Sequence, residues 1–197
     1  MLLVLGFLVA CQSDEPQAPR FGTHPGVSPA ISITDAGVRV VKASDHITGQ
    51  YPAHCARDGI SELYPVPTCT PGSLRDDVDP NNLKATICKP YWSSMHHPPR
   101  AETERVKTQA MAAYGVPPEK RDITELDHFY PVSFGGSNDV SNLWAQVSTR
   151  NSFWNDKDDV EIAVHYAICS GKVNWVDAVH AFDSDWRTAK QKLGLVK

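Results

Sequence analysis

Apolar residues recur with the spacing of an α-helix in two segments, 100–114 and 155–170, and capping residues indicate a last helix that starts at Asn174. The repeat is clearest in the second segment, at Val160, Val164, Ala167 and Ile168. Gly171 follows that repeat directly, and a glycine in this position is typical of a helix end. The side chain of Asn174 can cap the next helix. We therefore expect helices over these three segments.

A pattern typical of β-structure lies between the first two helices. Ile123–His128 places apolar residues among polar ones, 135–138 is a Gly-Gly-Ser-Asn turn, and Val140–Trp144 is a second short apolar run. Strands joined by such a turn form a hairpin. The segment 123–170 therefore predicts a hairpin followed by a helix. Ile31–Val41 has some β-branched alternation and predicts a further strand.

The remaining segments complete an α+β chain with additional helices. Residues 12–30 contain four prolines and few large apolar side chains, which indicates a disordered tether. The stretch 46–80 is rich in Pro, Asp and Gly and predicts irregular structure. We divide the chain into a leader at 1–11, a flexible linker at 12–45 and one domain at 46–197. The tryptophans expected in the core are Trp144, Trp154, Trp175 and Trp186.

The first ten residues, MLLVLGFLVA, are almost all apolar, and Cys11 follows them. This run is too short to span a bilayer and has the length of a signal-peptide core. Residues 8–11 resemble the lipobox of bacterial lipoproteins, although no Lys or Arg precedes the apolar run. The resemblance implies export and a lipid anchor on Cys11, at the periplasmic or cell-surface side of a membrane. The alternative is a cytoplasmic protein with an apolar N-terminus.

Four further cysteines fit an exported protein with two disulfides. They are Cys55, Cys69, Cys88 and Cys169. None belongs to a Cys-x-x-Cys pair, which argues against a zinc knuckle. Three pairings are possible, and of these we favour Cys69–Cys88 with Cys55–Cys169. The alternative is four reduced, buried thiols.

The chain has 197 residues and a formal net charge of -4, which is unusual for a protein that binds nucleic acid. The charge is uneven, however. Residues 82–121 contain seven Lys or Arg and three acidic residues. A polyanion could therefore dock on one face, although a solvated helix face would have the same composition.

The chemistry-bearing residues lie in the hairpin segment, which reads ELDHFYPVSFGGSNDVSNLW from Glu125 to Trp144. An Asp-His pair, Pro131 three residues after His128, the GGSND turn and the closing Asn-Leu-Trp together resemble the HNH endonuclease family. The resemblance covers about twenty residues closely and 69–169 loosely. It implies a ββα-metal core and cleavage of phosphodiester bonds. Singly, each residue except His128 is better explained by a turn or a cap.

Histidine titrates near neutrality, so His128 can take a proton from water and serve as the catalytic base. By resemblance, Asn142 clamps the loop across the hairpin and holds His128 in place. Asp127 offers a carboxylate to a hard cation, for which we expect Mg²⁺, with Mn²⁺ as the alternative. Because neighbours on a strand point to opposite faces, the backbone must bring Asp127 and His128 to one site.

The third residue of the HNH motif departs from the family pattern. A histidine nine residues after Asn142 is replaced by Asn151. The subgroup without a zinc knuckle places its ligand at the start of the last helix, which favours Asn155 as the second metal ligand. Asn151 and Asp156 remain alternatives. Arg150 and Lys157 flank this position and are candidate phosphate contacts.

We therefore expect a metal-dependent endonuclease with nucleic acid as its partner, DNA more than RNA. Two alternatives stand beside it. One is a protein that binds nucleic acid and has lost the chemistry, and the other is a structural envelope lipoprotein that retains the hairpin.

Overall fold

The computed structural model describes residues 33, 37–57, 59–150 and 155–196, within a unit that spans Ile31–Lys197. The expectations for Cys11, Asn151, Trp154 and the tether at 12–30 lie outside the described residues. The mixture of helices and small sheets confirms the α+β class. No described helix has both the length and the apolar character needed to cross a bilayer.

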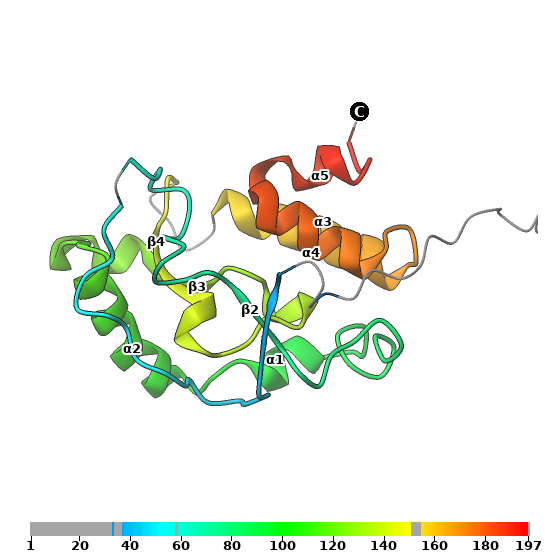
Figure 1. The fold of residues 1–197 in the computed structure, drawn as a ribbon, viewed down its shortest axis with the longest axis horizontal. Helices are drawn as coiled ribbons and strands as arrows, with labels where there is room; N and C mark the ends of the chain where they lie inside the picture. Colours follow the sequence, from blue (N-terminus) through cyan, green and yellow to red (C-terminus); the bar gives the residue numbers. More distant parts are fainter. Residues whose placement is uncertain (1–32, 34–36, 58, 151–154, 197) are drawn as a thin grey trace, which may run out of the picture. The chain divides into compact units, whose positions relative to one another are not determined.

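A two-stranded antiparallel hairpin lies at the centre of the candidate site (Figure 1). Strand β3 spans Thr124–His128, and strand β4 spans Leu143–Val147. Leu126 lies opposite Ala145, and both join an apolar cluster with α2 (Arg100–Ala113). Because side chains alternate along a strand, Glu125 and Asp127 point to the other face, toward the start of α3. The hairpin thus has an apolar face and a charged face.

The second strand begins later than its apolar run suggested. The sequence predicts a strand over Val140–Trp144, but Val140–Asn142 forms a 3₁₀ turn, η3. The Asp139 carboxylate accepts a hydrogen bond from the backbone N–H of Ser141 at 3.0 Å. This hydrogen bond keeps Val140–Asn142 in a turn and delays the start of the strand to Leu143. The reason is that the Asp139 carboxylate takes a backbone N–H that could otherwise pair with the other strand.

The C-terminal helices follow the predicted segments closely. Helix α3 spans Asp156–Cys169, and the side chains of Asn155 and Asp158 form a reciprocal capping box at its start. Helix α4 spans Trp175–Asp185, and the Asn174 side chain caps it as expected. A 3₁₀ turn at Trp186–Thr188 (η4) and the short helix α5 at Ala189–Lys192 follow. The predicted tryptophans Trp144, Trp175 and Trp186 are buried.

Short elements connect these parts. Strand β1 (Arg39–Val41) pairs in parallel with β2 (Ser73–Arg75), so the folded part extends into the range 12–45 expected as linker. Helix α1 spans Trp92–His96, and the 3₁₀ turns η1 and η2 span Pro118–Ile123 and Val132–Phe134. The irregular stretch 46–80 therefore contains one short strand, β2, in the part that the structure describes.

The disulfides differ from the pairing that we favoured. Cys55 pairs with Cys69, and Cys88 pairs with Cys169, with Cα atoms 5.9 Å and 5.3 Å apart. The expected Cys69–Cys88 and Cys55–Cys169 pairs are wrong because the cysteines belong to different apolar clusters. Cys55 and Cys69 pack in the cluster around α2, whereas Cys88 packs against the cluster that contains α3 and α4.

A candidate active-site pocket along the edge of the hairpin

A pocket of about 340 Å³ runs along β3. The only strand paired with β3 in the described sheet is β4, and all five residues of β3 line the pocket. Side chains on both faces of a strand can line a pocket at its edge. Asp127 and His128 therefore line the same pocket, although their side chains point to opposite faces of β3. The segment from α1 to α2 forms one wall, which includes His97 and Lys107, and α3 contributes to the other.

His128 lies at the end of β3 and is held by Asn138. Its Nε2 lies 2.8 Å from Oδ1 of Asn138. The Asn138 amide nitrogen donates to the carbonyl oxygens of Ser44 and His96, both at 2.9 Å, which identifies Oδ1 as the acceptor. Nε2 of His128 therefore carries the proton, and Nδ1 keeps its lone pair. In this tautomer the imidazole is oriented to accept a proton at Nδ1.

Burial, together with the neighbouring His97 ring, lowers the pKa of His128 to about 3. The two rings meet edge to face, with their centroids 5.5 Å apart. The His97 Nδ1 donates to the carbonyl oxygen of Ser93 at 2.7 Å, which leaves its Nε2 outside that contact. At neutral pH, His128 is therefore in the uncharged form that a proton acceptor requires.

Asn142 spans the loop between the two strands. Its Oδ1 accepts from the backbone N–H of Tyr130 at 2.9 Å, and its Nδ2 donates to the carbonyl oxygens of Tyr130 at 2.9 Å and Ser137 at 3.0 Å. Asn142 is fully buried, so these bonds are not exchanged with water. They tie both ends of the loop together directly beside Asn138. Asn142 thus acts on His128 through the loop rather than by contact.

Asp127 is held by two donors on its charged face of the hairpin. Its Oδ2 accepts from Trp144 Nε1 at 3.0 Å and from Lys157 Nζ at 2.8 Å. The Lys157 ammonium also donates to the carbonyl oxygen of His128 at 2.6 Å and to the Glu161 carboxylate. Burial opposes the charge of this lysine, but Asp127 and Glu161 outweigh it and raise the pKa of Lys157. Its side chain is 0% exposed, so the residue that we expected at a phosphate is enclosed inside the protein.

The other residues expected near a metal or a phosphate have partners at the start of α3. Asn155 is buried; its Oδ1 accepts from the backbone N–H of Lys157 at 2.8 Å, and its Nδ2 donates to Glu125 at 3.2 Å. Arg150 donates to Asp156 and, at 2.9 Å, to Asp159. The Asn155 oxygen is thus used by the helix cap, and Asp156 and Arg150 pair with each other.

Four carboxylates line the pocket on the charged face, and the sequence analysis had singled out one of them. They are Glu125, Asp127, Asp158 and Glu161. Burial and the neighbouring carboxylates raise the pKa of Glu125 to about 8 and that of Glu161 to about 7. Carboxylate oxygens are the donors that Mg²⁺ prefers, and a bound cation would favour the ionised form of these groups. The donor chemistry therefore fits a hard divalent cation, although no three His, Cys, Asp or Glu side chains within the described ranges are already grouped for one.

The sequence did not indicate the pocket residues whose role depends on partners far away in the chain. The ones missed are Asn138, Glu125 and Glu161. Lys107 was counted only among the basic residues of 82–121, and His97 was considered as a phosphate contact, with an exposed loop as the favoured explanation. A signal existed for Glu161, because it stands four residues after Lys157 and such pairs meet on a helix. Asn138 looked like an ordinary turn residue.

The pocket thus combines an oriented imidazole, a wall of carboxylates and a facing wall from α2. No family model, no curated protein and no solved structure matches this chain.

Proposed function

We propose that this protein is a metal-dependent endonuclease of the HNH type, which hydrolyses phosphodiester bonds of nucleic acid with His128 as the general base. The observation that carries the proposal is the orientation of His128. Its Nε2 is held by Asn138 at 2.8 Å, and the imidazole lines the same pocket as the Asp127 carboxylate. Hydrolysis needs a proton acceptor beside a site where a phosphate can be bound, and this pocket offers both.

In the proposed reaction, Nδ1 of His128 takes a proton from a water molecule. The water oxygen forms a bond to phosphorus, and the bond from phosphorus to the leaving sugar oxygen breaks. That oxygen takes up a proton from solvent, so the products are a phosphate monoester and a hydroxyl group. Asn138 and Asn142 hold the imidazole and its loop in place during this step.

A divalent cation, Mg²⁺ or Mn²⁺, would be held by Asp127 together with Glu125. These two carboxylates lie two residues apart on one face of β3, and both line the pocket. Such a cation supplies neutralisation of the charge that develops on the phosphate and the leaving oxygen. This donor pair replaces the Asp127–Asn155 pair that the sequence suggested, because the Asn155 oxygen accepts the helix-cap hydrogen bond.

Nicking of supercoiled plasmid tests the proposal, with Mg²⁺ or Mn²⁺ and with excess chelator as the control. We expect His128→Ala to lower the rate about 10³-fold, the range in which general bases contribute. His54→Ala is the matched control, because that histidine is exposed and lies outside the pocket lining. Full activity of His128→Ala, or activity that the chelator does not affect, would contradict this mechanism. Nucleic-acid binding without any cleavage would favour a binding protein that has lost the chemistry.

A further inference from the structure

Lys107 lies on α2, in the pocket wall that the segment from α1 to α2 forms. It is a charged residue that is only 6% exposed, and it lines the pocket together with His128 and Asp127. Within the part of the chain that the structure describes, no carboxylate lies within ion-pair distance of its ammonium, and no acceptor is hydrogen-bonded to it. Lys107 therefore differs from Lys157, whose ammonium has three oxygen partners.

The nearby carboxylates are already paired with other residues. Glu104 binds Arg121 at 2.6 Å, and Glu125 accepts from Asn155 at 3.2 Å. Burial lowers the pKa of Lys107, and the more distant charges of Glu104, Asp122 and Glu125 do not offset it. The stem of Lys107 is buried, but its ammonium is not enclosed, because Gln146 Oε1 is the only buried side-chain polar atom without a partner among the described residues. The ammonium therefore reaches the pocket without a close anion and can bind one there.

We propose that Lys107 binds a phosphate group of the nucleic-acid strand that enters the pocket. The identity of the anion rests on the proposed nuclease function. Two walls line the pocket: the segment from α1 to α2 contributes Lys107, His97 and Glu104, and α3 contributes Asp158 and Glu161. Glu104 is already paired with Arg121, which leaves Lys107 as the cation of its wall. A phosphate at Lys107 would lie against the wall opposite the α3 carboxylates, which repel it, in the pocket that His128 also lines. Lys107 is thus the substrate contact for which the sequence had suggested Lys157.

Binding is tested separately from cleavage in the full chain that carries His128→Ala. Fluorescence anisotropy with labelled DNA and RNA oligonucleotides measures the affinity, and inorganic phosphate serves as the competitor. We expect Lys107→Met to weaken binding about tenfold, which corresponds to one lost charged contact. The slope of log affinity against log salt should fall by about one phosphate contact. Lys107→Arg should retain most of the affinity.

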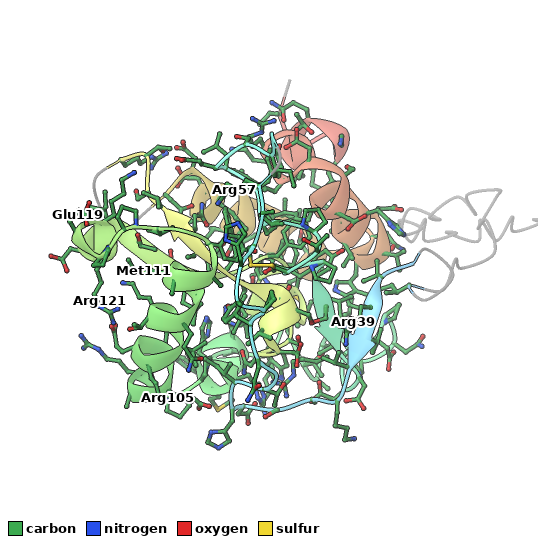
Figure 2. The ribbon with its side chains drawn as sticks, turned by 60° about the vertical axis from the view of Figure 1, so that its left-hand side comes forward. Arg39, Arg57, Arg105, Met111, Glu119 and Arg121 are labelled. Atoms are coloured by element: carbon green, nitrogen blue, oxygen red, sulfur yellow. A yellow bond between two sulfur atoms is a disulfide. The ribbon has the colours of Figure 1, made fainter. Side chains whose placement is uncertain are left out.

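Arg105→Met is the matched control for charge on the same helix. Arg105 lies on the outer side of α2 with 63% of its side chain exposed (Figure 2). The thermal midpoint supplies a second readout, because Met keeps the apolar packing of the lysine stem and should leave the midpoint unchanged while binding is lost. A purely structural lysine would give the reverse, a lower midpoint with unchanged affinity.

The outcomes separate this inference from the proposed function. Binding that depends on Lys107 without any cleavage by the parent protein supports the phosphate contact and contradicts the nuclease. Cleavage that depends on His128 with equal affinities for Lys107→Met and Arg105→Met overturns the phosphate contact and leaves the nuclease standing. Failure of the parent protein to bind either oligonucleotide overturns the phosphate contact as well.

Discussion

At the scale of single residues, two asparagines fix the orientation of the His128 imidazole. Asn138 contacts the imidazole directly, whereas Asn142 bonds to the backbone of the loop that carries Asn138. A side-chain amide both donates and accepts, so each asparagine joins groups that a carboxylate or an ammonium could not join alone. The site therefore depends on hydrogen-bond direction as much as on charge.

We predict that Asn142→Ala lowers the free energy of unfolding by about 3 kcal/mol, because it leaves buried backbone groups of the loop without partners. Urea unfolding measures this change. Asn81→Ala, at an exposed position, should change stability by less than about 0.5 kcal/mol. A loss as small as that of the control would show that water replaces the Asn142 bonds.

Asn138→Ala should lower the kcat of plasmid nicking about 10²-fold and leave KM unchanged, because the imidazole loses its orientation while the substrate contacts remain. Steady-state kinetics on a short duplex measures both constants. A change in KM alone would mean that Asn138 acts on substrate binding and not on His128.

At the scale of elements, the start of α3 joins the helix to the charged face of the hairpin. The capping box orders the first turn, and Asn155 and Lys157 reach across to Glu125 and Asp127. A helix end that is capped and bonded to a strand fixes the distance between the two elements. The carboxylate wall of the pocket depends on this junction.

We predict that Asn155→Ala destabilises the protein by about 1 kcal/mol, as expected for a lost N-cap, and leaves the affinity for Mn²⁺ unchanged. Asn155→Ser keeps an acceptor at the cap without a charge beside Glu125 and should retain more of the stability than Asn155→Ala. Thermal unfolding and calorimetric titration with Mn²⁺ measure the two quantities. A large loss of Mn²⁺ affinity in Asn155→Ala with normal stability would restore Asn155 as a metal ligand.

Strand β2 ends at the buried Arg75, whose ion pair with Asp77 makes the free energy of unfolding depend on pH in the acidic range. Arg75 bonds to Asp77 at 2.8 Å and holds the pKa of that carboxyl below its ordinary value of 3.8. Because the folded-state pKa is lowered, the contribution to stability is present above about pH 4 and is lost as the pH falls through the folded-state value. Asp77 is half-exposed, so solvent screens the pair and the effect is modest.

We therefore predict that Asp77→Asn is less stable than the parent protein at pH 7 and that the difference disappears at acidic pH, below the folded-state pKa. Urea unfolding across this pH range measures the difference. Asp122→Asn is the control, because Asp122 is exposed and makes no ion pair among the described residues. A difference for Asp77→Asn that persists at low pH would assign the effect to packing.

At the scale of the whole molecule, two apolar clusters support the pocket from its two sides. One surrounds α2 and one face of the hairpin, and the other contains α3, α4 and α5. Each apolar cluster is accompanied by one disulfide. Cys55–Cys69 closes a short loop near α2, and Cys88–Cys169 joins the segment before α1 to the end of α3. Each wall of the pocket is therefore stabilised by its own apolar cluster and its own disulfide.

The two disulfides should differ in their effect on stability. The sequence separations are 81 residues for Cys88–Cys169 and 14 for Cys55–Cys69. In the chain-entropy view, paired alanine substitutions cost about 4.5 kcal/mol for the long loop and about 3 kcal/mol for the short one. Urea unfolding of the two double variants measures the order. Equal losses, or a larger loss for Cys55 and Cys69, would show that strain or denatured-state structure outweighs loop entropy.

The sequence predicted the helices at 100–114 and 155–170 and the strand ending at His128 because local interactions decide them. Apolar spacing, a capping Asn and a closing Gly act within a few residues of one another. The start of β4 was missed because an Asp139 cap outweighed the apolar run that begins at Val140.

The sequence by itself determined the secondary structure around the pocket and singled out His128, Asp127 and Asn142. Only the tertiary structure decided the surroundings of the lysine side chains, because distant segments determine which of them are buried. Lys157 is enclosed between Asp127 and Glu161, whereas Lys107 lines the pocket without a close anion. The cysteine pairing was decided in the same way, since it follows from which apolar cluster each cysteine joins. Local patterns specify which element a residue belongs to, whereas its charge partners depend on how the elements pack.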